Sequence, residues 1–169
     1  MLQERFNYGA FLVAVVIVGL TLFLMGGVYF HVFGLYESFE QFDYHHWLSA
    51  IGTTYLAIVT PIYYLMKRRY SNRLKTLVNI HMVGNLLAVM LISVHFALEI
   101  GRPLDAYPRL GTGIVLYAAV LALVGTGFLL RFRQPKKTGG RSIRFVHTAV
   151  TVTFYFIIFV HILHGLEYI

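Results

Sequence analysis

The sequence predicts an all-α integral membrane protein, a single-domain bundle of five transmembrane helices. Of the 169 residues, 58% are hydrophobic and only 12% are charged, about half the charged share of a soluble domain. The mean hydropathy is +0.70. The charged residues also gather in short clusters between long apolar segments, which is the pattern of a chain that crosses a bilayer several times.

Five segments are long and apolar enough to cross the hydrocarbon core, which takes roughly 20 helical residues. Charged residues, Gly or Pro bound each of them. No small-x-small cleavage site follows the first segment, so we expect a retained helix and not a cleaved signal peptide. The predicted spans are 8–33, 47–66, 77–98, 110–130 and 145–166.

Basic residues concentrate on one side of the predicted membrane. Twelve of the 14 lie near the N-terminus or in the connections that follow the second and fourth spans. The other side carries only Arg102 and Arg109, together with six of the seven acids. The positive-inside rule then places the N-terminus in the cytoplasm and the C-terminus outside. We interpret the basic clusters as topology signals that contact membrane lipid, and not as a nucleic-acid site.

Cysteine is absent from the sequence. Disulfides, iron–sulfur clusters and the covalent C-x-x-C-H attachment of haem are therefore excluded. Any haem must be held by coordination and packing alone. Histidine is the remaining soft ligand, and the chain has eight of them.

Four histidines form two pairs with equal spacing. His81 and His95 lie in the third span, His147 and His161 in the fifth, and each pair is separated by 14 residues. Fourteen residues fall about 40° short of four helical turns, so both members of a pair project from nearly one face, about 21 Å apart. Ionisable residues within spans are rare and usually functional, although a single histidine can simply bridge two helices.

The third and fifth spans run in the same direction, so the two pairs match in depth. We predict two non-covalent b-type haems with bis-histidine ligation, which needs opposed imidazoles at two levels. His81 and His147 would hold the inner haem, and His95 and His161 the outer one.

The fourth span repeats the 14-residue interval in its glycines. Gly111 and Gly113 lie near its outer end, Gly125 and Gly127 near its inner end. The lack of side chains there would let a flat macrocycle approach the backbone at the two predicted depths. Close packing between helices predicts the same glycines.

His164 and Arg144 are further candidates for cofactor binding. His164 is turned about 100° from the direction of His147, against about 40° for His161, so we favour His161 as the ligand. His164 could instead meet a haem propionate, line an outer pocket or be interfacial. Arg144 is placed to pair with an inner-haem propionate, but a cation that snorkels to the interface explains it equally well.

The segments that run from His81 to His95 and from Arg144 to His161, with the glycine pairs between them, resemble di-haem b-type cytochromes. The H-x13-H helices are similar to the haem-binding bundle of cytochrome b in quinol–cytochrome c oxidoreductases. Ligands on the third and fifth spans are closer to the ferric-reductase-like transmembrane domain. The resemblance covers residues 77–166 and is one of spacing and topology.

The resemblance implies an electron-transfer subunit of a larger oxidoreductase. Ferric reductases continue with a sixth span and a flavin- and nicotinamide-binding domain, for which this sequence has no G-x-G-x-x-G element. We therefore expect donor and acceptor sites on partner redox subunits of the iron–sulfur, flavin or cytochrome c type. The expected location is the cytoplasmic membrane of a prokaryote.

Further histidines and acids collect on the predicted outer side, namely His31, Asp43, His45, His46 and Glu99. They could form a quinone or quinol site, bind a metal ion or dock an extracytoplasmic cytochrome, and interfacial histidines are also common without function.

Two functions outside electron transfer remain as alternatives. In a proton or metal-ion carrier the histidines would lie on a continuous polar path, but only Asn85 and Ser93 are strongly polar between His81 and His95. A structural membrane anchor for a redox enzyme fits the small size of the chain, but it leaves the histidine pairs unexplained.

Overall fold

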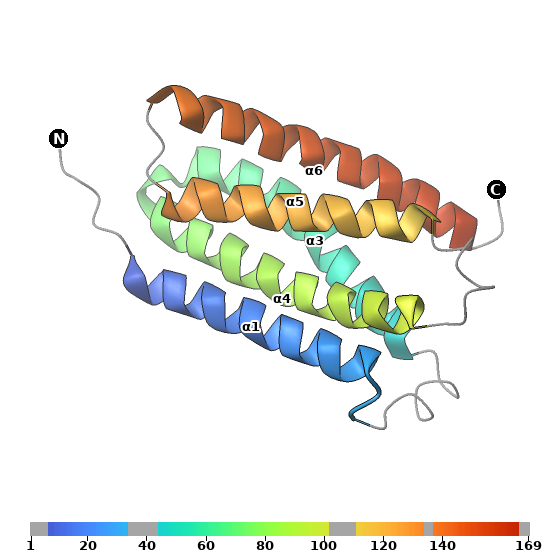
Figure 1. Ribbon diagram of the computed structural model, residues 1–169. Helices are drawn as coiled ribbons and strands as arrows, with labels where there is room; N and C mark the ends of the chain where they lie inside the picture. The colour runs from blue at the N-terminus through green and yellow to red at the C-terminus, as the bar shows by residue number, and fades with distance from the viewer. Residues whose placement is uncertain (1–6, 34–43, 102–110, 134–136, 166–169) are drawn as a thin grey trace. The chain divides into compact units, whose positions relative to one another are not determined.

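The structure is a computed structural model that describes residues 7–33, 44–101, 111–133 and 137–165. All regular elements in these residues are helices (Figure 1). In chain order they are α1 (Tyr8–Tyr29), α3 (Tyr44–Arg69), the short 3₁₀ helix η1 (Ser71–Arg73), α4 (Leu74–Ile100), α5 (Gly111–Phe132) and α6 (Lys137–Gly165).

Five helices in the described residues are long and apolar enough to cross a membrane, which confirms the predicted class. Many of their large apolar side chains are exposed, as at Phe23 (65% exposed) and Phe156 (70%), and this is the surface that lipid covers in a membrane protein. The membrane-compatible segments are Tyr8–Tyr29, His46–Arg69, Ser71–Ile100, Gly111–Phe132 and Gly140–His164.

The predicted end of the first span at residue 33 is wrong. Helix α1 ends at Tyr29, and the backbone then turns. The N–H of His31 donates to the carbonyl of Val28 (3.1 Å) and that of Val32 to the carbonyl of Gly27 (2.9 Å), which is the hydrogen-bond pattern of a Schellman helix end. His31 takes the left-handed position in this turn, with φ 56°.

The other helices extend beyond the predicted apolar spans. The largest difference is at α6, which begins at Lys137 and not at residue 145. The added segment carries Arg141 and Arg144, so the helix begins before the apolar run does.

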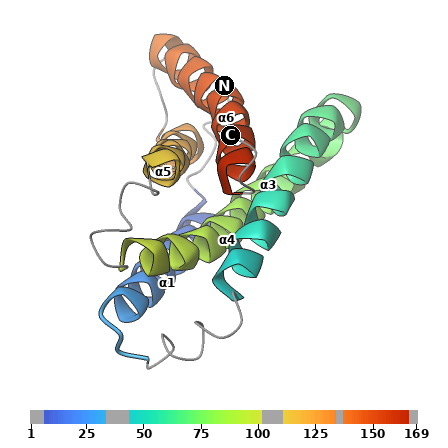
Figure 2. The same ribbon diagram turned by 90° about the vertical axis from the view of Figure 1, so that its right-hand side faces the viewer.

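The chain divides into two compact units, which are described separately. Residues 8–102 form one unit, in which α1 and α3 both pack against α4 (Figure 2). Val28 of α1 is buried with Ala97 and Leu98 of α4. Helix α3 approaches α4 closely at Gly52, where a Cβ atom would lie only 2.8 Å from the backbone oxygen of Ala88.

The second unit contains the antiparallel pair of α5 and α6. Its buried apolar side chains are Leu116, Tyr117 and Val120 of α5 and Phe154 and Ile158 of α6. Phe154 lies midway between His147 and His161 along α6, so the core of the pair lies between the two histidines.

Candidate functional site

Both predicted ligands on α6 contact α5 in the same way. The Nδ1 atom of His147 lies 2.7 Å from Oγ1 of Thr126, and Nδ1 of His161 lies 3.0 Å from Oγ1 of Thr112. The two threonines are themselves 14 residues apart, as the histidines are. The helix pair therefore repeats one side-chain contact at two levels.

The contact of Thr126 with His147 bears on the tautomer of the His147 ring. The Thr126 hydroxyl is within hydrogen-bond distance of the carbonyl of Ala122, at 2.7 Å. A hydroxyl has a single proton, so when Thr126 donates it to Ala122, its Oγ1 accepts from Nδ1–H of His147. The lone pair of a neutral His147 is then on Nε2, the nitrogen that remains for a metal ion.

The four predicted glycines of α5 fall into two kinds. A Cβ atom at Gly113 would lie 3.5 Å from Cε1 of His161, and one at Gly127 would lie 3.7 Å from Cε1 of His147. Those are ordinary contact distances. At Gly111 and Gly125 a Cβ atom would meet nothing within 4 Å, so these two glycines leave open space beside the backbone.

Open space is also present at the end of this helix pair where α5 begins. An apolar hollow of about 350 Å³ is lined there by residues of both helices. The lining residues are Gly111, Thr112, Val115, Phe156, Ile157 and Val160. Thr112, which contacts His161, is one of the lining residues. Apolar space is therefore present at about the level of His161 along the helix pair.

Arg144 and His164 lie near the ends of the same helix, α6. Both side chains are exposed. Arg144 precedes His147 by three residues, and His164 follows His161 by three. Each therefore lies about one turn from a predicted ligand, on the side of the helix end.

His81 of α4 has different neighbours from the histidines of α6. Its ring stacks on that of Tyr63 from α3, with centroids 4.2 Å apart and planes at 14°. The Nδ2 atom of Asn85 lies 3.4 Å from both ring nitrogens, so this contact does not select one tautomer. The amide oxygen of Asn85 is buried and makes no hydrogen bond within the described part of the chain.

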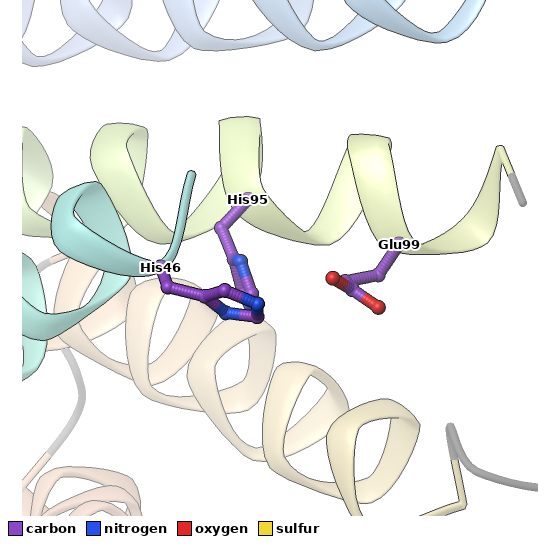
Figure 3. Close-up of side chains that lie close together, drawn as sticks. All are labelled: His46, His95 and Glu99. Carbon is purple, nitrogen blue, oxygen red and sulfur yellow. The ribbon is translucent and has the colours of Figure 1, made fainter. Parts of the chain in front are cut away.

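His95 of α4 lies beside a second histidine and a carboxylate. The ring of His46 from the first turn of α3 is 5.3 Å from the ring of His95, centre to centre. Glu99, one turn further along α4, completes a group whose ligand atoms all lie within 4.8 Å of one another. Figure 3 shows the His95 and Glu99 side chains on one side of α4, with the His46 ring against the tip of His95.

The predicted outer cluster is only partly retained. His46 and Glu99 come together with His95, which the sequence predicts as a ligand of the outer haem alone. His31 is in the turn after α1 and is not part of this group. Asp43 and the side chain of His45 lie outside the described residues.

The four predicted haem ligands are divided between the two units. His81 and His95 belong to one, His147 and His161 to the other. The predicted pairings of His81 with His147 and of His95 with His161 therefore stay predictions.

Four neighbours of the histidines were not among the predicted site residues. These are Thr112, Thr126, Tyr63 and Asn85. The threonines had a visible signal, because each is the centre of a Gly-Thr-Gly triplet and the two triplets are 14 residues apart. Tyr63 had none, since its contact with His81 depends on how α3 packs on α4.

Comparison with known proteins adds no relative. No protein-family model matches the chain, and searches of curated proteins and of solved structures give no significant match.

Proposed function

We propose that this chain is a di-haem b-type cytochrome subunit that carries electrons across a membrane. The observation that carries the proposal is the repeated contact between α5 and α6, in which a threonine holds Nδ1 of His147 and another holds Nδ1 of His161. At each of two levels, about 21 Å apart by helix rise, this contact involves Nδ1 and not Nε2 of the imidazole.

The surroundings of these two histidines favour a porphyrin over a bare metal ion. Within the described residues, the one group of three or more His, Cys, Asp or Glu side chains that could hold a metal does not include His147 or His161. A bare ion at either level would have too few protein ligands. Haem brings four nitrogens of its own and needs only axial imidazoles.

The residues present fit such a group. The open space at Gly111 and Gly125 and the apolar hollow beside Thr112 give room for a flat ring. His81 and His95, 14 residues apart on α4, supply the opposite ligands in this proposal: His81 with His147 at the inner level, His95 with His161 at the outer level. Arg144 and His164, exposed at the ends of α6, are placed to meet propionates.

Bound haem supplies reversible one-electron chemistry, and the protein sets its ligation and surroundings. When Thr126 accepts from Nδ1–H, the lone pair of a neutral His147 is on Nε2, the nitrogen that would face a haem iron. Within a bilayer the apolar helices would keep both levels in a surrounding of low dielectric constant, which is one of the factors that set a haem potential.

The setting of the protein is part of the proposal. The distribution of basic residues supports a cytoplasmic N-terminus and an outer C-terminus in a prokaryotic inner membrane. The electrons would come from a quinol pool or a partner redox subunit and leave to an acceptor on the opposite side. The sequence resemblance to di-haem cytochromes supports the same role.

The test is the haem content of the purified protein and of four variants. We expect a reduced spectrum with a b-type α band and two haems per chain by pyridine hemochrome assay. His81→Ala and His147→Ala should each leave one haem, and the remaining haem should be the same one by its potential. His95→Ala and His161→Ala should each leave the other.

The matched control is His164→Ala, which should retain two haems because His161 is the proposed ligand. A colourless, correctly folded protein would contradict the proposal and favour a histidine-based carrier or an anchor. Loss of a haem in His164→Ala but not in His161→Ala would identify His164, one turn further along α6, as the outer ligand in place of His161.

A further inference from the structure

His46, His95 and Glu99 form a side-chain cluster in the unit of α1, α3 and α4. His95 and Glu99 are four residues apart on α4 and therefore share a helix face. His46 reaches them from the first turn of α3. One ligand atom from each of the three lies within 4.8 Å of the others, and Figure 3 shows the three side chains converging.

We propose that His46, His95 and Glu99 bind a divalent first-row transition-metal ion. Two imidazoles and one carboxylate are the donors that Zn²⁺ and its neighbours in the first row accept. Three protein ligands leave a fourth position for water, which is the arrangement of an open site and not of a closed structural one.

The geometry needs only a small adjustment to close on an ion. Bonds of about 2.0–2.1 Å to a tetrahedral ion bring ligand atoms to roughly 3.3 Å from one another. His95 and Glu99 are half-buried on one helix, whereas His46 is exposed. The exposed His46 ring is the ligand that can turn toward the other two without repacking a core.

The site has a consequence for the proposed outer haem, and this consequence rests on the proposed function. A neutral imidazole has one lone pair, so His95 cannot ligate the haem iron and a second metal ion at once. The ion would therefore compete with the outer haem iron for His95. Among the residues that the structure describes, no such cluster includes His81, so the proposed inner haem should not respond to the ion.

The experiment is a Zn²⁺ titration of the purified full-length protein, with bound zinc measured by equilibrium dialysis. Zn²⁺ is redox-silent and colourless, so the visible spectrum reports on haem alone. We expect one saturable Zn²⁺ per chain. His46→Ala and Glu99→Gln should each weaken binding by at least about tenfold, without loss of haem.

The control variant is His31→Asn, which changes a histidine outside the cluster of the same unit. Asn tolerates the left-handed backbone at this position, so the variant should fold and bind Zn²⁺ as the unchanged protein does. Absence of saturable binding would overturn the proposal. Equal affinity in the unchanged protein, His46→Ala and Glu99→Gln would overturn it as well.

The spectrum distinguishes failure of the site from failure of the proposed function. If both proposals hold, Zn²⁺ should convert about half of the low-spin haem absorbance, and His46→Ala should prevent this change. Saturable Zn²⁺ binding with an unchanged spectrum would show that His95 is not a ligand of the outer haem. It would overturn the proposed competition between Zn²⁺ and the haem iron for His95. Binding of Zn²⁺ to a protein that contains no haem would contradict the proposed function alone.

Discussion

In the α5–α6 pair the two histidines have the same neighbours, whereas in the α3–α4 pair they do not. His147 and His161 each meet a threonine through Nδ1. His81 stacks on an aromatic ring, and His95 lies against a histidine and a carboxylate. The two histidines therefore have the same surroundings in the α5–α6 pair and chemically different surroundings in the α3–α4 pair.

The glycines differ between the two pairs in a parallel way. In α3 and α4, Gly52 and Gly84 lie where a Cβ atom would overlap the facing helix, at the Ala88 backbone and the Tyr55 hydroxyl. In α5, Gly113 and Gly127 face histidine rings at ordinary contact distance. The first kind allows helices to approach closely, and the second kind borders the candidate ligands.

The largest effect that we predict from this difference is on stability. Gly52→Ala should lower the free energy of unfolding by about 1–3 kcal/mol, because the new methyl group meets the backbone of Ala88 and the helices must move apart. Gly113→Ala should change it by less than about 0.5 kcal/mol. Unfolding of both variants in detergent, with Gly19→Ala as a lipid-facing control, measures the difference.

Equal losses for Gly52→Ala and Gly113→Ala would contradict the comparison. They would mean that the α5–α6 contact is as tight as the α3–α4 contact. The glycines of α5 would then be explained by helix packing, and their spacing would no longer support a cofactor.

The sequence was sufficient to predict the five apolar helices, because hydropathy follows directly from composition along the chain. It did not predict the end of α1 at Tyr29. Three of residues 30–33 are large and apolar, and the helix ends where the hydrogen bonds of the turn and the positive φ of His31 begin. An apolar run in the sequence indicates which residues lie in the membrane, but it does not show at which residue the helix ends.

The candidate site likewise combines features that the sequence predicts with features that depend on how the helices pack. The 14-residue spacing of His81, His95, His147 and His161 was evident because periodicity within one helix is local. The association of His46 with His95 and Glu99 was not, since it depends on how α3 packs against α4. The Gly-Thr-Gly repeat was visible, but the role of its threonines needed the facing helix.

The second-largest predicted effect is a change in redox potential. It tests whether the two threonine–histidine contacts of the α5–α6 pair are equivalent. Thr126→Val and Thr112→Val each remove the hydroxyl beside an Nδ1 atom. If haem is bound as proposed, loss of this partner makes Nε2 a weaker donor and disfavours the ferric state, so the midpoint potential of the proposed haem at that level should rise. A tenfold change in the affinity of the axial ligand for ferric haem relative to ferrous haem corresponds to about 59 mV.

Redox titration of the two variants measures both potentials. Thr126→Val should shift only the inner haem and Thr112→Val only the outer one, by similar amounts. Thr126→Ser and Thr112→Ser retain the hydroxyl and should restore the original potentials. A shift in one variant and none in the other would show that the two contacts, although alike in geometry, do not act alike.

The smallest predicted effect concerns the asymmetric pair. Tyr63→Leu removes the ring that stacks on His81 and should lower the free energy of unfolding by about 0.5–1 kcal/mol, the usual value of an aromatic pair beyond its buried area. Tyr63→Phe keeps the ring and should retain this stability. Detergent unfolding of the two variants measures it.

The stack involves only the inner level of α4, so the variant also separates the two haems. Tyr63→Leu should alter the midpoint potential of the haem that His81→Ala removes and leave the other unchanged. If both potentials move together, the stack acts through the α3–α4 packing as a whole. The differences between His81 and His95 would then not be independent, and His46, in the first turn of α3, would be expected to move with Tyr63.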